Sequence, residues 1–510
     1  LALAQGDFAS TFQKEHPGVT VMWAGAAGFL LKYPAYVTLG PGQQERLPRF
    51  NQLLDDMGLN ALDLLKTGRT FMVVGIVAAL ALAFLEAVRL IGLLPAMLGF
   101  LLIAFDPFLI ALSRLLHLDG LVSALMLLSL LAWLNFLYRG NRLEDLALSA
   151  IAAGLSWLTK SPALFLLPFV GLTCLVEMER TWRKEKTFPR ALFWRLVRFG
   201  LVWSGIGVVL FVLFFPAMWI DPINSLRQIF AGAANYGYEG HDSITFFNGR
   251  VYQARIPDWR FYPINYFWRT TPVALLGLAL LVIALLLPRK FWLTQMHRRT
   301  IVHLGLFALL FTVFMTFGAK KFDRYLLPVF APLDLLAGLG WFAISRLNQP
   351  GHTNRSRRPS GRHLGAITIL SAVILFQSIS ALRTYPYYFD YYNPLAGGNA
   401  RAPRVMMIGW GEGLDQAARY LNAKPQAEKL RVAAWYPEGP FSYFFKGITL
   451  RDDLPSDPTE LPKTDYVVLY YHQWQRQLPS PEFLSYFDAQ TPEKIIYVDD
   501  LEYARIYRLP

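Results

Sequence analysis

Charged residues are scarce in this chain of 510 amino acids: only 17% are Asp, Glu, Lys or Arg, whereas 54% are hydrophobic. Soluble proteins carry about 25% charged residues, and here the shortfall is concentrated in long apolar windows separated by short basic ones. This pattern excludes a soluble globular enzyme and indicates a membrane protein. Cysteine is scarcer still. The single Cys174 lies in an apolar run, so a disulfide scaffold is excluded as well.

The sequence also lacks the motifs of familiar nucleotide-binding, metallohydrolase and redox sites. We find no GxGxxG, P-loop, HExxH, CxxC or GxSxG in a fitting context. Lys and Arg outnumber Asp and Glu by 49 to 36. Because the excess lies in loops beside apolar segments, it indicates contact with anionic lipid headgroups, and we expect no nucleic-acid partner.

Ten windows are apolar and long enough to cross about 30 Å of hydrocarbon. They cover residues 70–88, 91–112, 120–138, 145–159, 162–178, 199–219, 270–288, 301–318, 325–345 and 364–382. The two windows on either side of the sequence LTKSP are short, which is typical of tilted or broken helices. The chain is therefore predicted to be a multi-pass protein of the plasma membrane.

Basic residues predict which side of the membrane each connection faces. The connections at 139–142, 179–198, 289–299 and 346–363 are rich in Lys and Arg and are predicted to be cytoplasmic by the positive-inside rule. The alternate connections, and everything after residue 383, then face outward. Most of the mass outside the bilayer is predicted to be extracytoplasmic.

The fold class predicted is an α-helical polytopic membrane protein with a small extracytoplasmic α/β domain at its C-terminal end. Residues 1–69 are predicted to form a first extracytoplasmic loop with interfacial helices, 70–382 a transmembrane domain of about ten helices with an outer loop at 220–269, and 383–510 the α/β domain. Within that domain RVMMIGW, RVAAWYP, DYVVLYYH and EKIIYVDD are predicted as strands, and GLDQAARYLNA and SPEFLSYFDAQ as helices.

Basic residues on the outer face are candidates for function, because they do not serve orientation. They occur in three places: Lys14-Glu15-His16, Lys160 in LTKSP, and GAKKFDRYLLP with Lys320, Lys321, Arg324 and Tyr325. Several cations at one membrane face form a seat for a phosphate or diphosphate carried on a lipid. The alternative is that each lysine merely extends its ammonium group to the headgroups.

Acidic residues in apolar surroundings also have either a functional or a structural interpretation. Asp119 begins a helix at the outer face, where it caps the helix, binds a cation or contacts a sugar hydroxyl. Glu86, Asp106 and Asp334 fall within apolar windows, and pairing with a neighbouring Arg or Lys is the simplest interpretation of all three.

The 220–269 loop is rich in aromatic residues, which serve either for stacking on sugars or as an interfacial belt. Its His241-Asp242 pair is a weak metal signal. A divalent metal is conceivable there but unsupported.

Four segments in their order along the chain resemble glycosyltransferase family 39. They are HPG, SRLLHLDGLVSALMLLSLL, GLSWLTKSPALFLLP and GAKKFDRYLLPVFAPLDLLAGLG. This family belongs to the C-type membrane glycosyltransferases, which include protein O-mannosyltransferases and the lipid A aminoarabinose transferase. LTKSP looks like the family's LTKGP, and KKFDRYLLP like its K-x-x-R/T-Y-x-L-P. The resemblance covers roughly residues 5–345, and the segment from YYFDYYNPLAGG onward looks like an extension found in some members.

The resemblance implies a C-type glycosyltransferase-like fold and an inverting glycosyltransferase. Such enzymes transfer a sugar from a polyprenyl-phosphate donor at the extracytoplasmic face, with no required cofactor. Lys160, Lys320 and Arg324 would hold the phosphate, Asp119 would be the second acidic residue, and Glu15-His16-Pro17 would match the family's HPP or EKP stretch.

The family's catalytic base falls before the segment that matches the start of this chain. Leu1 is not a methionine, and LALAQGDFAS is not a signal peptide. We therefore expect a first transmembrane helix and the main catalytic base upstream of residue 1, and little turnover by the chain as printed.

Two other classes of function stay open. A transporter or flippase of lipid-linked sugars also requires outward cations, although it is expected to show pseudo-symmetric halves. A non-catalytic assembly subunit would use the α/β domain for docking. The identity of the sugar has no motif in the sequence, and the acceptor is a protein, a lipid or a polysaccharide.

Overall fold

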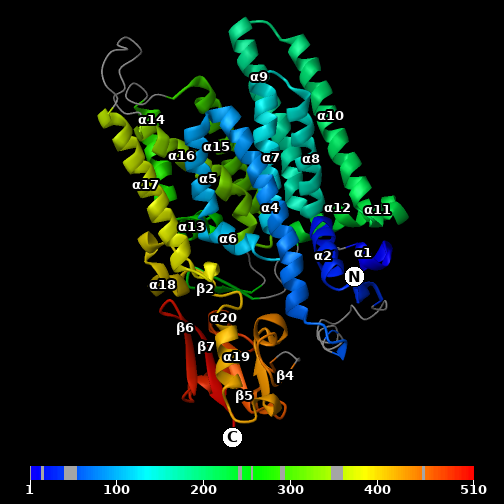
Figure 1. Cartoon of the computed structure of the whole chain (residues 1–510), viewed down its shortest axis with the longest axis vertical. Coiled ribbons are helices and arrows are strands. Elements are labelled where there is room, and N and C mark those ends of the chain that lie inside the picture. Colours follow the sequence, from blue (N-terminus) through cyan, green and yellow to red (C-terminus); the bar gives the residue numbers. More distant parts are fainter. Residues whose placement is uncertain are drawn as a thin grey trace. The chain divides into compact units, whose positions relative to one another are not determined.

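The computed structural model describes residues 2–12, 16–38, 54, 56–238, 244–253, 257–287, 293–345, 360–450 and 454–510 (Figure 1). The chain divides into two compact units. The helical unit comprises Leu1–Thr38, Leu65–Glu239 and Thr270–Leu382. The α/β unit comprises Leu39–Leu64, Gly240–Arg269 and Arg383–Pro510.

Six helical stretches are long and apolar enough to span a membrane, so the chain is a multi-pass membrane protein. They are α4 (Ala61–Ile91), α7 (Leu118–Tyr138), Ser161–Glu185 with α9 (Leu166–Glu185), α10 (Arg190–Phe214), α15 (Gln295–Phe317) and Asp323–Ser345 with α16 (Leu327–Ser345). Two pairs of consecutive helices also pass when each pair is taken as one span. They are α5 (Leu93–Ala104) with α6 (Pro107–Ser113), bent by 64°, and α13 (Phe261–Arg269) with α14 (Pro272–Leu286).

The remaining predicted windows also fall on helices. The window at 145–159 is α8 (Leu143–Thr159), a 17-residue helix, and the window at 364–382 lies within α17 (Ser360–Arg383). The described part of the chain thus contains six to eight spans by length and composition, fewer than the ten windows. The difference arises because α8 ends early, at the LTKSP turn, and because α17 contributes only a shorter apolar helix, Ser371–Arg383.

The basic segment 179–198 is not the long loop that the sequence predicts. Helix α9 continues to Glu185 and α10 begins at Arg190, so the connection is only the four residues between them. Lys and Arg are good helix formers, and the basic residues therefore extend the two helices instead of breaking them.

Small residues let the central helices pack closely. A Cβ atom on Gly340 of α16 would lie 1.9 Å from the carbonyl oxygen of Gly277 on α14, and one on Gly338 would lie 2.4 Å from the amide nitrogen of Gly99 on α5. Such glycines let helix backbones approach within van der Waals contact. Helices α7 and α16 are the most enclosed, with 94% and 83% of their spanning windows buried.

Folded elements also occupy the segments predicted as outer loops. In the N-terminal segment α1 (Ala2–Gln5) precedes α2 (Val19–Lys32), whose 14 residues are too few to span. Between α10 and α13 lie α11 (Ala217–Ile220), α12 (Pro222–Tyr238) and a hairpin of β1 (Thr245–Phe247) and β2 (Arg250–Tyr252).

The α/β unit is built on a five-stranded sheet in the order β4-β3-β5-β7-β6. The strands are β3 (Arg431–Ala434), β4 (Ile448–Leu450), β5 (Tyr466–Tyr470), β6 (Lys494–Val498) and β7 (Leu501–Arg508). Strands β3, β4 and β5 are parallel, and β7 runs antiparallel to both β5 and β6. Alternate residues of β5 face opposite sides, packing with α19 (Leu414–Asn422) on one and α21 (Pro481–Asp488) on the other.

Three of the four strands predicted in this domain are present, but RVMMIGW is not a strand. The Gln475 side chain replaces a strand partner there: its Oε1 accepts from the amide of Ile408 at 2.8 Å, and its Nε2 donates to the carbonyl of Met406 at 2.8 Å. Gln475 belongs to α20 (Tyr471–Arg476), which the sequence did not predict. Strands β4 and β7 were also missed, whereas both predicted helices are present as α19 and α21.

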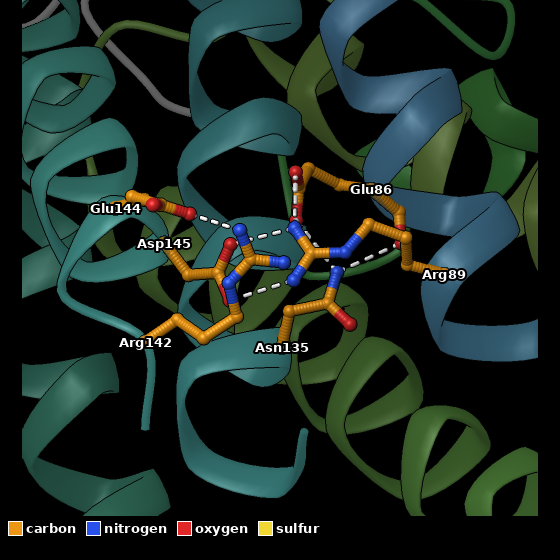
Figure 2. Close-up of polar contacts among 6 residues, drawn as sticks. All are labelled: Glu86, Arg89, Asn135, Arg142, Glu144 and Asp145. Atoms are coloured by element: carbon orange, nitrogen blue, oxygen red, sulfur yellow. Dashed lines mark hydrogen bonds and ion pairs between the residues drawn. The ribbon is translucent and has the colours of Figure 1, made fainter. Parts of the chain in front are cut away.

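A buried polar cluster joins one end of α4, α7 and α8 (Figure 2). Arg89 of α4 donates to Glu86 on its own helix at 2.9 Å and to both carboxylate oxygens of Asp145 on α8 at 2.6 and 2.8 Å. Asn135 of α7 donates to the Glu86 carboxylate at 2.7 Å. The prediction that Glu86 pairs with a nearby basic residue is therefore confirmed, and the partner is shared with Asp145.

We expect Arg89→Ala to destabilise the helical unit by about 3–5 kcal/mol, because it leaves two buried carboxylates without their cation. Arg142 is the matched control: it pairs with Glu144 in the same view, but their side chains are 53% and 75% exposed. Arg142→Ala should change stability by less than about 1 kcal/mol. Thermal unfolding of the purified protein in detergent measures both, and equal midpoints for the two variants would contradict the assignment.

Candidate active site

Asp119 lies in the first turn of α7, where a carboxylate is favoured by the helix dipole. His117 caps this helix, accepting the Asp119 amide at Nδ1 over 3.4 Å, and the same ring nitrogen lies 3.3 Å from Asp119 Oδ2. The hydroxyl of Ser123, one turn further along, donates to the Asp119 carbonyl at 2.7 Å. Asp119 is only 2% exposed, so its charge requires partners within the protein.

Lys160 supplies the first partner. The residue is extended, with φ −155° and ψ 135°, between α8 and the 3-10 turn Ser161–Phe165. Pro162 has no amide hydrogen with which to continue the α-helical hydrogen bonds, and it lies in the first turn of the 3-10 segment, so α8 ends here. The ammonium Nζ donates to Asp119 Oδ1 at 2.5 Å and lies 4.3 Å from the ring centre of Tyr325. Lys160 is 4% exposed, so this is a buried ion pair.

The turn Asp323–Leu326, just before α16, supplies the second partner. Arg324 Nε lies 3.5 Å from Asp119 Oδ2, and its guanidinium carbon is 4.0 Å from the ring centre of Phe322 and 5.2 Å from that of Tyr325. Lys321 is buried in the segment leading to this turn, and Lys320 is half-buried.

His16 lies beside the LTKSP turn, next to Ser161. Its Nδ1 is 3.4 Å from the hydroxyl of Ser161, and the amide of Gly18 donates to the carbonyl of Thr159 at 3.2 Å. Burial and then the positive charge of Lys160 lower the pKa of His16 to about 3, so its ring is neutral near pH 7.

Side chains from four separate segments therefore meet in one place, which we name the Asp119 cluster: His16, His117, Asp119, Lys160, Arg324 and Tyr325. The structure brings together most of the described residues proposed from the sequence. Lys14, Glu15 and His241 lie outside the described residues. His117 was missed, although its place two residues before Asp119 is a helix-capping position.

Two cations converge on the one carboxylate of the cluster. Both carboxylate oxygens of Asp119 face cations, Lys160 on one side and Arg324 on the other, while Lys321 lies buried three residues before Arg324. Buried charges are stable only when compensated. The Asp119 carboxylate holds Lys160 in place, and guanidinium and ammonium groups gathered in this way are the side chains that bind phosphate.

The two remaining acidic residues in the apolar windows do not pair with Arg or Lys among the described residues, so that interpretation is wrong for Asp106 and Asp334. Asp106 caps α6, accepting the amide of Leu109 at 2.7 Å. Asp334 is buried on α16, close enough to Asp106 for an electrostatic interaction. Within the described part of the chain, Oδ2 of neither residue has a hydrogen bond.

A metal centre has no ligand set in the part of the chain that the structure describes, where no three His, Cys, Asp or Glu side chains gather. Asp242, like its neighbour His241, lies outside that part. The Asp119 cluster holds one carboxylate amid cations, which disfavours a divalent cation there.

A double-mutant cycle tests the Asp119–Lys160 contact. We expect Asp119→Asn and Lys160→Met each to lower stability, and the double variant to lower it by less than their sum. The coupling should be about 1–3 kcal/mol, as for buried groups in one polar network. The measurement is denaturation of the detergent-purified protein. Additive effects, within about 0.5 kcal/mol, would show that the contact is not made.

Stability should also depend on His16 in mild acid. Its folded pKa of about 3 is below the ordinary value of 6.5, so the unfolded chain binds the extra proton first. This contribution is therefore complete above pH 6.5 and is lost as pH falls toward 3. We expect His16→Gln to give a shallower loss of thermal stability between pH 7 and pH 5 than the parent. Identical slopes would contradict the burial of the ring.

No protein-family model and no curated protein matches this chain. Among solved structures it is similar to ArnT from Cupriavidus metallidurans, in the apo state and bound to undecaprenyl phosphate. The identity is 13%, the TM-scores are 0.48 and 0.46, and the alignments cover 99% of this chain and 96% of ArnT. It is also similar to the oligosaccharyltransferase AglB from Archaeoglobus fulgidus in complex with an inhibitory peptide and a dolichol-phosphate. There the identity is 11% and the TM-score 0.42, over 90% of this chain and 65% of AglB.

Proposed function

We propose that this protein is a membrane glycosyltransferase that transfers a sugar from a polyprenyl-phosphate donor to an acceptor at the extracytoplasmic face of the plasma membrane. The observation that carries the proposal is the meeting of Lys160 and Arg324 at the buried carboxylate of Asp119, in a helical unit that spans the membrane. The motifs that resemble glycosyltransferase family 39, LTKSP and KKFDRYLLP, are the ones that supply these cations.

The positive-inside distribution supports the extracytoplasmic assignment. Asp119 lies at the N-terminal end of α7 and Lys160 at the C-terminal end of α8, whereas the basic residues Arg139 and Arg142 lie at the opposite ends of these helices. With Arg139 and Arg142 in the cytoplasm, the Asp119 cluster faces outward.

The reaction needs positive charge beside the phosphate oxygen that leaves the sugar, because negative charge develops on it. An acceptor hydroxyl attacks the anomeric carbon, the bond from that carbon to the phosphate oxygen breaks, and the lipid leaves as a phosphate that carries one more negative charge. The hydroxyl proton passes to a base. Lys160 and Arg324 would stabilise the growing charge on the leaving phosphate, an interaction that is stronger in the transition state than in the bound donor.

Asp119 is best suited to a positioning role. Its two carboxylate oxygens hold Lys160 at 2.5 Å and approach Arg324 to 3.5 Å, fixing both cations relative to the aromatic ring of Tyr325. A cation held rigidly in a low-dielectric site stabilises developing charge without reorganising. His16, which is neutral, can donate or accept a hydrogen bond beside it.

Binding of undecaprenyl phosphate tests the proposed seat directly. We expect Arg324→Ala to weaken binding by about 10- to 100-fold, because a charge-assisted hydrogen bond contributes about 1.5–3 kcal/mol. Arg324→Lys should retain part of the affinity. Native mass spectrometry or a lipid-binding titration of the purified protein measures this.

Two controls separate the phosphate from the rest of the lipid. Arg183→Ala alters an exposed arginine at the end of α9 and should leave binding unchanged. Undecaprenol, which lacks the phosphate, should bind Arg324→Ala and the parent equally. If Arg324→Ala bound undecaprenyl phosphate as well as the parent did, the seat would be misplaced. A separate experiment addresses the sugar and the acceptor: mass spectrometry of the glycans that are lost when the gene is deleted would identify both.

A further inference from the structure

The α/β unit contains a topological switch point between β3 and β5. These strands are neighbours and parallel, but the chain leaves β3 toward β4 on one side and leaves β5 toward β6 on the other. In open sheets with parallel strands, ligands bind at the carboxyl ends of the two strands where the connections diverge. The residues that follow β3 and β5 therefore occupy the position at which this architecture places a ligand.

Aromatic rings gather at that position around His472. Trp435 and Tyr436 follow the last residue of β3, Tyr470 is the last residue of β5, and His472 comes two residues later. The His472 ring centre lies 5.5 Å from that of Trp435, 5.4 Å from that of Tyr436 and 5.1 Å from that of Tyr470, all edge to face. These side chains form one aromatic cluster, in which His472 and Tyr470 are fully buried and Tyr436 reaches the surface.

Polar atoms in this aromatic cluster have no partner among the described residues. Both ring nitrogens of His472 and the indole nitrogen of Trp435 are buried without a hydrogen bond. The backbone of Ile408 and Gly409 approaches the imidazole, but not in hydrogen-bonding geometry. An unsatisfied buried polar group costs about 1–3 kcal/mol, so three in one place indicate partners that a ligand supplies.

The segment Gly409–Gly413 (GWGEG) passes beside the same strand ends. Gly409, Gly411 and Gly413 all have positive φ, and a Cβ on Gly409 would lie 2.3 Å from the Tyr470 hydroxyl. Only glycine allows the backbone this approach. The amide of Gly411 then donates to that hydroxyl at 3.0 Å, which in turn donates to the Glu412 carbonyl at 3.0 Å.

The charges at this site favour a neutral ligand. A glycine-rich segment before a helix is typical of phosphate sites, but here the Glu412 carboxylate accepts the amide of Trp410 at 2.6 Å, and Asp415 lies in the first turn of α19. The Glu412 carboxyl opposes an anion and Asp415 is paired with Arg419 at 2.8 Å, while the positive charge of Arg476 near His472 opposes a cation. Burial lowers the pKa of His472 to about 3, so the ring is neutral and offers one donor and one acceptor.

One aromatic ring is also presented to solvent. Tyr436 is 37% exposed and is held in the left-handed conformation, with φ 55° and ψ 55°. That conformation is uncommon for a bulky residue and concentrates at binding sites. Flat aromatic faces beside neutral hydrogen-bonding groups match a sugar ring, whose C–H faces stack on aromatics while its hydroxyls donate and accept.

We propose that the carboxyl ends of β3 and β5 form a binding site for a neutral sugar, with Tyr436 stacking on the ring and His472 and Trp435 Nε1 bonding its hydroxyls. This site goes beyond the proposed transfer reaction, because it binds sugar in the absence of any lipid donor. The ligand class is an uncharged hexose unit, free or within an oligosaccharide.

Saturation-transfer NMR on the full chain in lipid nanodiscs, free of glycoside detergent, tests this site. The probes are the methyl glycosides of mannose, glucose, galactose and N-acetylglucosamine, together with mannotriose. We expect at least one of them to receive saturation, and we expect Tyr436→Ala and His472→Phe each to weaken its binding by about tenfold or more. Because both His472 nitrogens lack hydrogen bonds, His472→Phe removes no protein contact of that kind and should fold with at least the parent's stability.

Tyr497→Ala, which alters an exposed tyrosine on the edge strand β6, is the matched control and should bind sugar as the parent does. Arg324→Ala should also bind sugar normally, so loss of the phosphate seat is distinguishable from loss of this site. If none of the probes bound, or if Tyr436→Ala and His472→Phe both bound as the parent does, the proposed site would be wrong.

Discussion

The buried ion pair between Lys160 and Asp119 is the contact on which the candidate site in the helical unit depends. Two opposite charges, both almost completely buried, lie 2.5 Å apart where α7 begins and α8 ends. Neither ion is stable there alone, since a buried charge without its partner costs several kcal/mol. The break at LTKSP, where Pro162 ends the α-helical hydrogen bonding, allows this pairing. In a continuous helix the backbone at Lys160 would not be extended, and the ammonium would not be presented to the first turn of α7 in this way.

Charged side chains gather at both ends of the α7–α8 pair, but their arrangement differs between the two ends. At one end Arg89 of α4 pairs with Glu86 on its own helix and with Asp145 on α8, while Asn135 of α7 bonds Glu86, so the cluster links three helices. At the other end a single carboxylate lies among Lys160 and Arg324, with Lys321 buried nearby. The first cluster is closed by hydrogen bonds between helices, whereas the second gathers Lys160 and Arg324 in the segments that the proposed function assigns to the lipid phosphate.

Periodicity and charge predicted much of this arrangement. Each apolar window lies on a helix, and His16, Lys160 and Arg324, from three motifs far apart in the sequence, lie in one cluster. The side of the membrane that they face stays a prediction. Local patterns failed where a tertiary contact decided the outcome. RVMMIGW has the composition of a strand, but Gln475 takes the hydrogen bonds that a strand would need. The basic segment 179–198 resembled a loop only because charge was given more weight than helix propensity.

Residues that act through a distant partner could not be found in the sequence at all. Arg89 and Asp145 are 56 positions apart, and nothing in either segment marks the pairing. His472 of α20 is similar: it is one of eight histidines, and its importance depends on the rings of Trp435 and Tyr436, which follow β3 about 36 positions earlier in the sequence. The glycines of GWGEG can be seen in the sequence. The close approach of the Tyr470 hydroxyl, which leaves no room for a side chain at Gly409, cannot.

The two proposed sites differ in chemistry as their proposed ligands do: the Asp119 cluster is charged and would bind a lipid phosphate, whereas the carboxyl ends of β3 and β5 are aromatic and would bind a neutral sugar. A lipid phosphate must lose water to enter the helical unit, and only cations fixed in a low-dielectric environment compensate that loss. A neutral sugar would gain little from such cations. It gains from aromatic faces and from neutral groups whose hydrogen bonds it completes, which is what the carboxyl ends of β3 and β5 provide. A protein that handles a charged sugar donor and an uncharged sugar needs both environments. Placing them in separate units lets the charge balance of one be set without disturbing the other.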